Sequence, residues 1–178
     1  RLLRVVTGLR REAGARKFAL NLIVGVLPSA VFGLLLHKLI KAHLFNSVVV
    51  AVALIVGGLI IFWVERRERV PRITEVDQME WPDALKLGLA QVVSLIPGTS
   101  RSGATIIGGM LFGLSRKAAT EFSFFLAIPT MFLATGYDVY KSWHTLAQQD
   151  LAFFAVGFVT AFFSALLAIK GLIRYVAH

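Results

Sequence analysis

The sequence lacks cysteine and has few charged residues. None of its 178 residues is a cysteine, which excludes disulfide bonds and thiolate metal sites. Only 16% of the residues are charged and 57% are hydrophobic, with a mean hydropathy of +0.74. Soluble globular domains are usually less apolar and more charged. The composition therefore predicts an integral membrane protein, whose length suits one membrane domain and leaves no room for a sizeable soluble one.

Acidic residues are scarce relative to basic ones. Lys and Arg number 19 against 10 Asp and Glu, so the formal net charge is +9. A basic excess can indicate nucleic-acid binding, but no basic patch interleaved with aromatic residues and no nucleic-acid motif accompanies it. The basic residues cluster between apolar stretches, as the positive-inside rule predicts for cytoplasmic loops. We therefore expect contact with membrane lipids and no nucleic-acid partner.

The first residues show no signal-peptide pattern. The chain opens on Arg1 without a methionine, and residues 1–17 contain six Lys or Arg, which does not fit a secretory signal. We interpret residues 1–17 as a basic cytoplasmic segment. We also expect the sequence to be an interior part of a longer protein.

Apolar runs alternate with polar connections along the chain. Four runs are long enough to cross a hydrocarbon core of about 30 Å as helices. The predicted transmembrane helices are residues 18–36, 47–64, 118–136 and 151–173. The predicted fold class is an all-α integral membrane protein, with residues 1–178 as a single membrane domain. Residues 65–83 form the longest polar segment between spans.

Two further apolar stretches are too short to cross. Ala84–Ile96 has 13 residues and Ala104–Leu114 has 11, and as helices they reach about 20 and about 16 Å. If this pair enters and leaves the membrane on one side, 14 Lys and Arg lie on that side and three on the other. A single broken helix that crosses would spread them more evenly. The positive-inside rule therefore favours a re-entrant helix–loop–helix, residues 84–115, entered from the cytoplasm.

The connection between the two short stretches contains the most informative residues. Residues 97–103 read Pro-Gly-Thr-Ser-Arg-Ser-Gly, and an arginine at that depth is costly unless it faces a cavity or a ligand. Glycines let the backbone approach an anion, and amides at the start of a helix from Ala104 add partial positive charge. Hydroxyls supply further donors, and the Arg101 guanidinium suits a phosphate. The candidate anion-site residues are Gly98, Thr99, Ser100, Arg101, Ser102, Gly103 and Thr105.

Two other interpretations of this loop explain less. The spacing fits a P-loop, but Ala104 stands where that motif has lysine and no βαβ pattern surrounds it. Tight packing between the hairpin helices explains the small residues but not Arg101. Gly109 and Gly113, by contrast, are expected to be packing positions.

Several polar residues outside the loop have alternative interpretations. Glu121 is either a helix-start acid that partners Arg116 or Lys117, or a polar wall of the site. Gln91 is predicted to hydrogen bond between helices, with substrate contact as the alternative. The four histidines fall in connections or at the end of the sequence and lack mutual metal-ligand spacing. No metal ligand is therefore assigned in this chain.

The stretch around the loop resembles a known family. Residues 88–105 are similar to a signature of the undecaprenyl-diphosphate phosphatases, the bacitracin-resistance family, and Glu121–Pro129 and Gly25–Pro28 continue the resemblance over essentially the whole chain. The resemblance implies an inverted-repeat architecture in which each repeat has a re-entrant helix pair. It implies hydrolysis of undecaprenyl diphosphate, a polyprenyl diphosphate lipid, to undecaprenyl phosphate plus phosphate, with a divalent cation, Mg2+ or Ca2+, as cofactor. It further implies the bacterial cytoplasmic (inner) membrane, a role in cell-wall synthesis, and bacitracin resistance.

The same resemblance implies roles for individual residues. Ser100, Arg101 and Thr105 match the family's phosphate-site positions and are the expected catalytic residues. Arg101 would clamp the diphosphate, while Ser100 and Thr105 would donate hydrogen bonds, with Ser100 also a candidate nucleophile. The expected substrate-binding residues are Gly98, Thr99, Ser102, Gly103, Glu121 and Gln91.

The chain also departs from the family pattern. The family's first signature is a glutamate pair four residues apart, a Pro-Val-Ser-Ser-type loop and a histidine; the nearest pattern here is Glu65-x-x-Glu68. The metal ligand and the general acid/base are therefore expected in a missing N-terminal part, and this chain alone is expected to be inactive. A transporter or flippase for a lipid-linked or other anionic substrate is the alternative, because broken helices also bind anions in secondary transporters. A homodimer is a further expectation.

Overall fold

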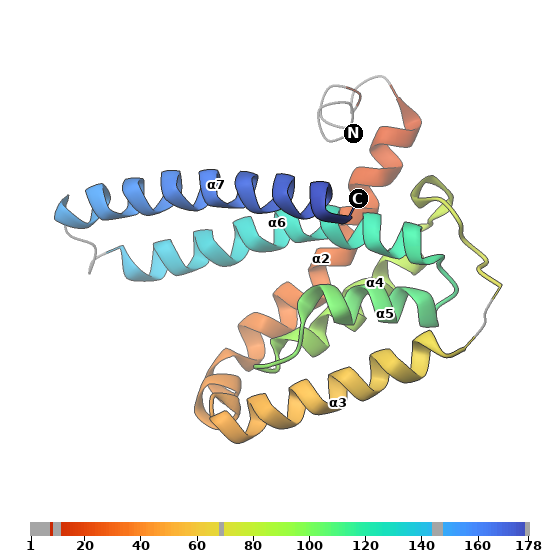
Figure 1. Cartoon of the computed structure of the whole chain (residues 1–178), viewed down its shortest axis with the longest axis horizontal. Coiled ribbons are helices and arrows are strands. Elements are labelled where there is room, and N and C mark those ends of the chain that lie inside the picture. The colour runs from red at the N-terminus through yellow and green to blue at the C-terminus, as the bar shows by residue number, and fades with distance from the viewer. Residues whose placement is uncertain (1–7, 9–11, 68–69, 144–147, 177–178) are drawn as a thin grey trace. The chain divides into compact units, whose positions relative to one another are not determined.

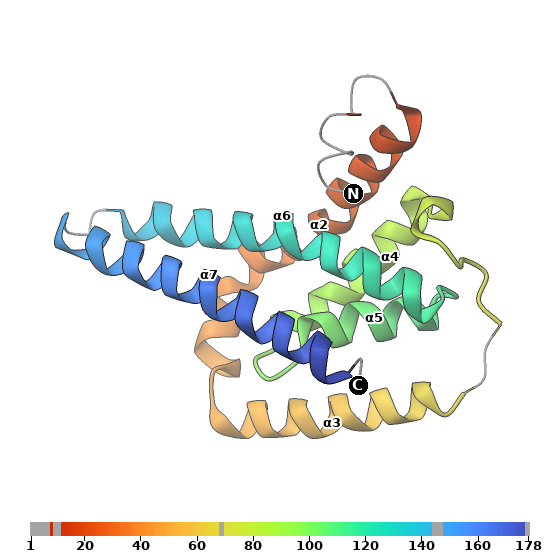
Figure 2. The same ribbon diagram turned by 45° about the horizontal axis from the view of Figure 1, so that its top comes forward.

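The computed structural model describes residues 8, 12–67, 70–143 and 148–176, and in these residues the regular elements are helices. The chain divides into two compact units, Arg1–Phe132 and Leu133–His178. Figures 1 and 2 show the helices in two views. The elements are α2 (Ala13–Leu39), the π-helical turn η1 (Ile40–Leu44), α3 (Ser47–Glu65), η2 (Val76–Gln78), α4 (Trp81–Val92), η3 (Val93–Leu95), α5 (Arg101–Leu111), α6 (Arg116–Ser142) and α7 (Gln148–Val176).

Four helices are long and apolar enough to cross a membrane, which confirms the all-α membrane fold. They span Ala13–Leu44, Ser47–Glu65, Arg116–Ser142 and Leu151–Gly171. Three of them begin or end beyond the predicted apolar runs; α2, for example, starts at Ala13 inside the expected basic segment. Hydropathy marks only the part of a helix that suits hydrocarbon, whereas the helix itself continues through flanking polar residues. Residues 1–7 and 9–11 of the basic segment lie outside the described residues.

The second unit contains the end of α6 and the helix α7. All described side chains of α7, residues 151–171, are exposed, and its 18-residue apolar window buries none of its residues. A helix that is apolar on all sides and exposed suits a lipid environment.

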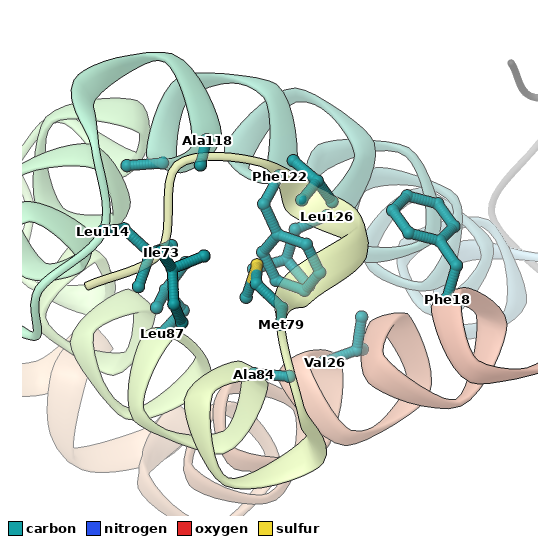
Figure 3. Packing of buried hydrophobic residues seen from close by; sticks show 12 residues of the cluster. Phe18, Val26, Ile73, Met79, Ala84, Leu87, Leu114, Ala118, Phe122 and Leu126 are labelled. Carbon is teal, nitrogen blue, oxygen red and sulfur yellow. The ribbon is translucent and has the colours of Figure 1, made fainter. Parts of the chain in front are cut away.

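The polar connection between α3 and α4 contributes apolar side chains to the core of the first unit. Ile73 and Met79, in the connection between α3 and α4, are 3% and 0% exposed. Figure 3 shows both side chains inside the apolar cluster, Ile73 near Leu87 of α4 and Met79 near Phe122 of α6. Residues 65–83 therefore do more than connect two spans, because their few apolar side chains anchor the connection to the helices.

Small residues let the helices of this unit approach closely. A Cβ on Gly88 of α4 would overlap the Gly25 carbonyl of α2, and one on Gly109 of α5 would lie 2.9 Å from the Ala119 Cβ of α6. Gly109 is thus a packing position, as predicted. The same prediction for Gly113 is wrong, because Gly113 has φ +93° and directs the chain out of α5 in a left-handed conformation.

The two ends of the α4–α5 pair lie beside each other. The amides of Arg72 and Ile73, before α4, donate to the carbonyl of Gly113 after α5, at 2.8 and 3.0 Å. The Ser115 amide donates back to the Ile73 carbonyl at 2.7 Å, and Figures 1 and 2 show α4 and α5 side by side. The α4–α5 pair therefore folds back on itself, as a re-entrant pair would, whereas a single broken crossing helix would keep these ends apart; entry and exit on one side of the membrane stays a prediction. The membrane side from which it enters stays a prediction.

Candidate anion site at the start of α5

The connection from η3 to α5 begins with a tight turn that only glycine accommodates. The Thr99 amide donates to the Ile96 carbonyl at 3.1 Å, and Gly98 has φ +92°. Pro at the second position and Gly at the third are the residues of a type II turn. A Cβ on Gly98 would also lie 2.6 Å from the Val50 carbonyl oxygen of α3. The sequence Pro97-Gly98 therefore turns the chain directly against α3.

Helix α5 begins at Arg101, so the predicted start at Ala104 is wrong by three residues. Ser100 is the N-cap: its side-chain oxygen accepts from the Gly103 amide at 3.1 Å, and its carbonyl accepts from the Ala104 amide at 2.8 Å. This capping arrangement extends the helix backwards into the hydroxyl-rich segment. Arg101 and Ser102 thus lie in the first helical turn and not in the loop.

The first turn of α5 presents open hydrogen-bond donors. The amides of Arg101 and Ser102 make no hydrogen bond to the residues that the structure describes, as is usual for the first amides of a helix. The hydroxyls of Ser100 and Ser102 are exposed and lie 3.3 Å apart. With the partial positive charge of the helix N-terminus, these donors suit an anion.

The Arg101 guanidinium extends this set of donors into a buried position. Its Nη1 atom is shielded from solvent and has no hydrogen-bond partner in the described part of the chain. A buried donor without a partner costs about 1–3 kcal/mol, and more when it is charged. Arg101 is therefore held in a conformation that an anionic ligand, which could accept from Nη1, would stabilise.

Thr105, one turn after Arg101, is buried and faces α6. It is 1% exposed, and its Oγ1 lies 3.1 Å from the Arg101 carbonyl, 3.2 Å from the Ser102 carbonyl and 2.5 Å from the Ser123 Oγ of α6. The predicted donation from Thr105 to a phosphate would have to replace one of these bonds.

Gln91 hydrogen bonds between helices, as predicted. Its Nε2 donates to the Ser29 hydroxyl of α2 at 2.7 Å and to the Thr130 hydroxyl of α6 at 3.2 Å. Both hydroxyls in turn lie within hydrogen-bond distance of carbonyls of their own helices, those of Val26 and Leu126. Gln91 thus links α2, α4 and α6, and its contact with substrate stays a prediction.

Comparison with known proteins decides the family. A family model described as "Bacitracin resistance protein BacA" matches residues 1–178, the whole chain. The chain belongs to this family. A curated relative named undecaprenyl-diphosphatase, from Methylococcus capsulatus, is 58% identical over 176 residues, and one of the same name from Laribacter hongkongensis is 60% identical over 177 residues. Both comparisons cover 99% of this chain but 64% and 65% of the relatives, so the chain spans less than two thirds of their length.

In this BacA-family chain the residues predicted for the anion site fall into two groups. Residues 98–103 form one continuous turn and helix start at one end of α5, as the preceding contacts show. Glu121 is half-buried in α6, and its place as a wall of the site stays a prediction. Ser123 was missed, because one serine in an apolar helix gives no sign of its partner, 18 positions away in the sequence.

The described residues offer no ligand set for a cation. No group of three His, Asp or Glu side chains that could hold a metal ion occurs among them. Arg116 and Lys117 at the start of α6 pair with Glu65 and Glu75, at 2.6 and 2.9 Å. These carboxylates thus already have cationic partners in the structure.

Proposed function

We propose that this chain contributes the diphosphate-binding half of an undecaprenyl-diphosphate phosphatase. The reaction is hydrolysis of undecaprenyl diphosphate to undecaprenyl phosphate plus phosphate, in the cytoplasmic membrane of a bacterium. It recycles the lipid carrier for cell-wall synthesis and thereby confers resistance to bacitracin. Membership of the BacA family and the name undecaprenyl-diphosphatase of the relatives support the reaction. The observation that carries the proposal is the buried Nη1 of Arg101, which has no partner among the described residues.

The donors at the start of α5 fit the headgroup of such a lipid. The Arg101 guanidinium forms a planar fork that can grip two phosphate oxygens. The open amides of Arg101 and Ser102 and the exposed hydroxyls of Ser100 and Ser102 supply further donors on the same turn. A membrane-embedded re-entrant pair keeps this end of α5 accessible to a headgroup whose apolar tail stays in lipid.

These donors can lower the barrier as well as bind the lipid. During phosphoryl transfer negative charge spreads over the equatorial oxygens and the leaving oxygen. Fixed donors in a site that excludes water stabilise this charge without reorganising. Arg101 therefore stabilises the transition state, and the N-cap contact of Ser100 keeps the helix start in place while it does so.

We further propose Mg2+ or Ca2+ as the cofactor and a homodimer as the assembly. Since no described group of three His, Asp or Glu side chains fits a cation, none of these residues is assigned to it. Loss of phosphate release in EDTA and recovery with Mg2+ or Ca2+ tests the cofactor. Native mass spectrometry from lipid nanodiscs tests the dimer.

Phosphate release from farnesyl or undecaprenyl diphosphate tests the function, measured in detergent on the full-length protein, since this chain alone is expected to be inactive. We expect Arg101→Ala to lower kcat/KM by about 100- to 1000-fold, the usual cost of removing one donor to a developing charge. Arg101→Lys keeps the charge but loses the fork, and we expect it to recover only part of this loss. Undiminished activity of Arg101→Ala would refute the site. Lipid movement in liposomes without phosphate release by the wild type would indicate a transporter instead.

A further inference from the structure

Ser123 of α6 makes a buried hydrogen bond to Thr105 of α5, and Ser123 has no role in the proposed reaction as described above. It lies in the first third of α6, is 1% exposed, and follows Phe122, which is 0% exposed. Its Oγ is 2.5 Å from the Oγ1 of Thr105. Two hydroxyls in such surroundings are retained only if their hydrogen bonds compensate for the loss of water.

The protons of the two hydroxyls can be assigned by counting donors. Carbonyl oxygens only accept, so the hydrogen bonds of Thr105 with the carbonyls of Arg101 and Ser102 must use the Thr105 proton. Ser123 has one hydrogen-bond partner among the described residues, the Thr105 oxygen. If Thr105 donated to Ser123, the Ser123 proton would be buried without an acceptor, which is costly. Ser123 therefore donates to Thr105, and Thr105 donates to the carbonyls of the first turn.

This direction links α6 to the peptide groups that face the anion. The Arg101 carbonyl and the Ser102 amide belong to one planar peptide unit, as do the Ser102 carbonyl and the Gly103 amide. A hydroxyl that holds the carbonyl end of such a unit also fixes the direction of its amide. The Ser102 amide is one of the open donors at the start of α5.

We propose that Ser123 is a positioning residue that acts through Thr105. It holds the first turn of α5 so that the Ser102 amide and the Arg101 side chain point at the diphosphate. The inference rests on the proposed function, and it assigns Thr105 to the support of the turn and not to direct donation to phosphate. A small displacement of such donors is expensive, since misplacement by about 1 Å can cost about 100-fold in rate.

A double-mutant cycle tests the link. We expect Ser123→Ala and Thr105→Val each to lower kcat by about tenfold or more, with KM changed less than about threefold, because donors that strengthen at the transition state are misdirected. The double variant should be no slower than Thr105→Val alone, because Ser123 acts only through the Thr105 hydroxyl. Thr105→Ser keeps the hydroxyl and should retain most of the activity, although valine resembles threonine more closely in shape.

Leu126→Val is the matched control for loss of packing. Leu126 lies one turn after Ser123 on α6 and is 0% exposed, and its side chain has no polar role. The reductions in kcat caused by Leu126→Val and by Thr105→Val should multiply in the double variant, since no hydrogen bond joins the two side chains. Wild-type kcat in Ser123→Ala, or multiplicative effects of Ser123→Ala and Thr105→Val, would overturn the inference. If Ser123→Ala does not fold, the contrast between Thr105→Ser and Thr105→Val decides, and equal activities of the two would overturn the inference.

A binding measurement separates this inference from the function itself. If the full-length wild-type protein releases no phosphate, the proposed function fails, and the affinity for inorganic pyrophosphate replaces kcat as the readout. Ser123→Ala should then weaken pyrophosphate binding by about two- to threefold, in line with the small change expected in KM, while Leu126→Val should not change it. Equal affinities of Ser123→Ala and the wild type would overturn the inference.

Discussion

Substitution of Gly98 by alanine should destabilise the protein through two separable effects. An alanine at φ +92° would adopt a left-handed conformation, which costs about 1–2 kcal/mol for a residue with a Cβ. Its Cβ would also lie 2.6 Å from the carbonyl oxygen and 2.9 Å from the Cα of Val50, both backbone atoms that cannot rotate away. Overpacking of this kind costs about 1–3 kcal/mol. We therefore expect Gly98→Ala to lower the free energy of unfolding by about 2–5 kcal/mol in total.

Gly113 provides a control in which only the first effect operates. It has φ +93°, but a Cβ there would meet its nearest atom, the Arg72 Cβ, at 3.5 Å, an ordinary contact. Gly113→Ala should therefore cost about 1–2 kcal/mol. The difference between the two variants measures the contact of the turn with α3.

The two free energies can be measured by reversible unfolding in mixed micelles, with phosphate release of the full-length variants followed in parallel. Gly98 precedes the N-cap by two residues, so displacement of the turn in Gly98→Ala should lower kcat/KM. Gly113→Ala leaves this turn in place, and its kcat/KM should stay near that of the wild type. Equal destabilisation by the two substitutions would show that Val50 does not confine the turn. Wild-type stability of Gly98→Ala would refute the turn conformation itself.

Three further predictions concern the re-entrant pair and its supports. Cysteines at Arg66 and Lys117, both exposed, should react with a membrane-impermeant thiol reagent from the same side of the membrane; reaction from opposite sides would refute the re-entrant form. Asp83→Ala removes the 2.5 Å ion pair with Arg72 and the hydrogen bond that the Asp83 side chain accepts from the Glu80 amide. We expect it to lower the free energy of unfolding by about 1–2 kcal/mol. Asp83→Asn keeps the acceptor for the Glu80 amide and should lower the free energy of unfolding by less. Gln91→Leu removes the donor to two hydroxyls and should lower the free energy of unfolding by about 1–3 kcal/mol; no change in the unfolding curve would contradict its role between helices.

Much of the site could be predicted because its signals are local. The hydropathy of consecutive residues marks the spans, and two apolar stretches too short to cross indicate a re-entrant pair. Pro97-Gly98 specifies a turn by backbone sterics alone. The cost of an arginine at depth singles out Arg101 before any contact is known. The sequence pattern places the start of α5 three residues late, because it does not show which of several neighbouring hydroxyl residues is the N-cap.

What the tertiary structure decided concerns pairs of residues far apart in the chain. Whether Gly113 packs or turns depends on its φ angle, and whether Ile73 and Met79 are solvated or buried depends on which helices surround them. The partner of Ser123 likewise appears only when α5 and α6 lie together.

The sequence by itself thus determined a membrane protein and its apolar spans, and it predicted an anion site at the Pro97-Gly98 turn, because these follow from the chemistry of neighbouring residues. The structure alone decided that Thr105, in the first turns of α5, meets the Ser123 hydroxyl of α6. Hydrogen bonds are short-ranged and directional, so a partner 18 residues away leaves no periodic or compositional trace in the chain.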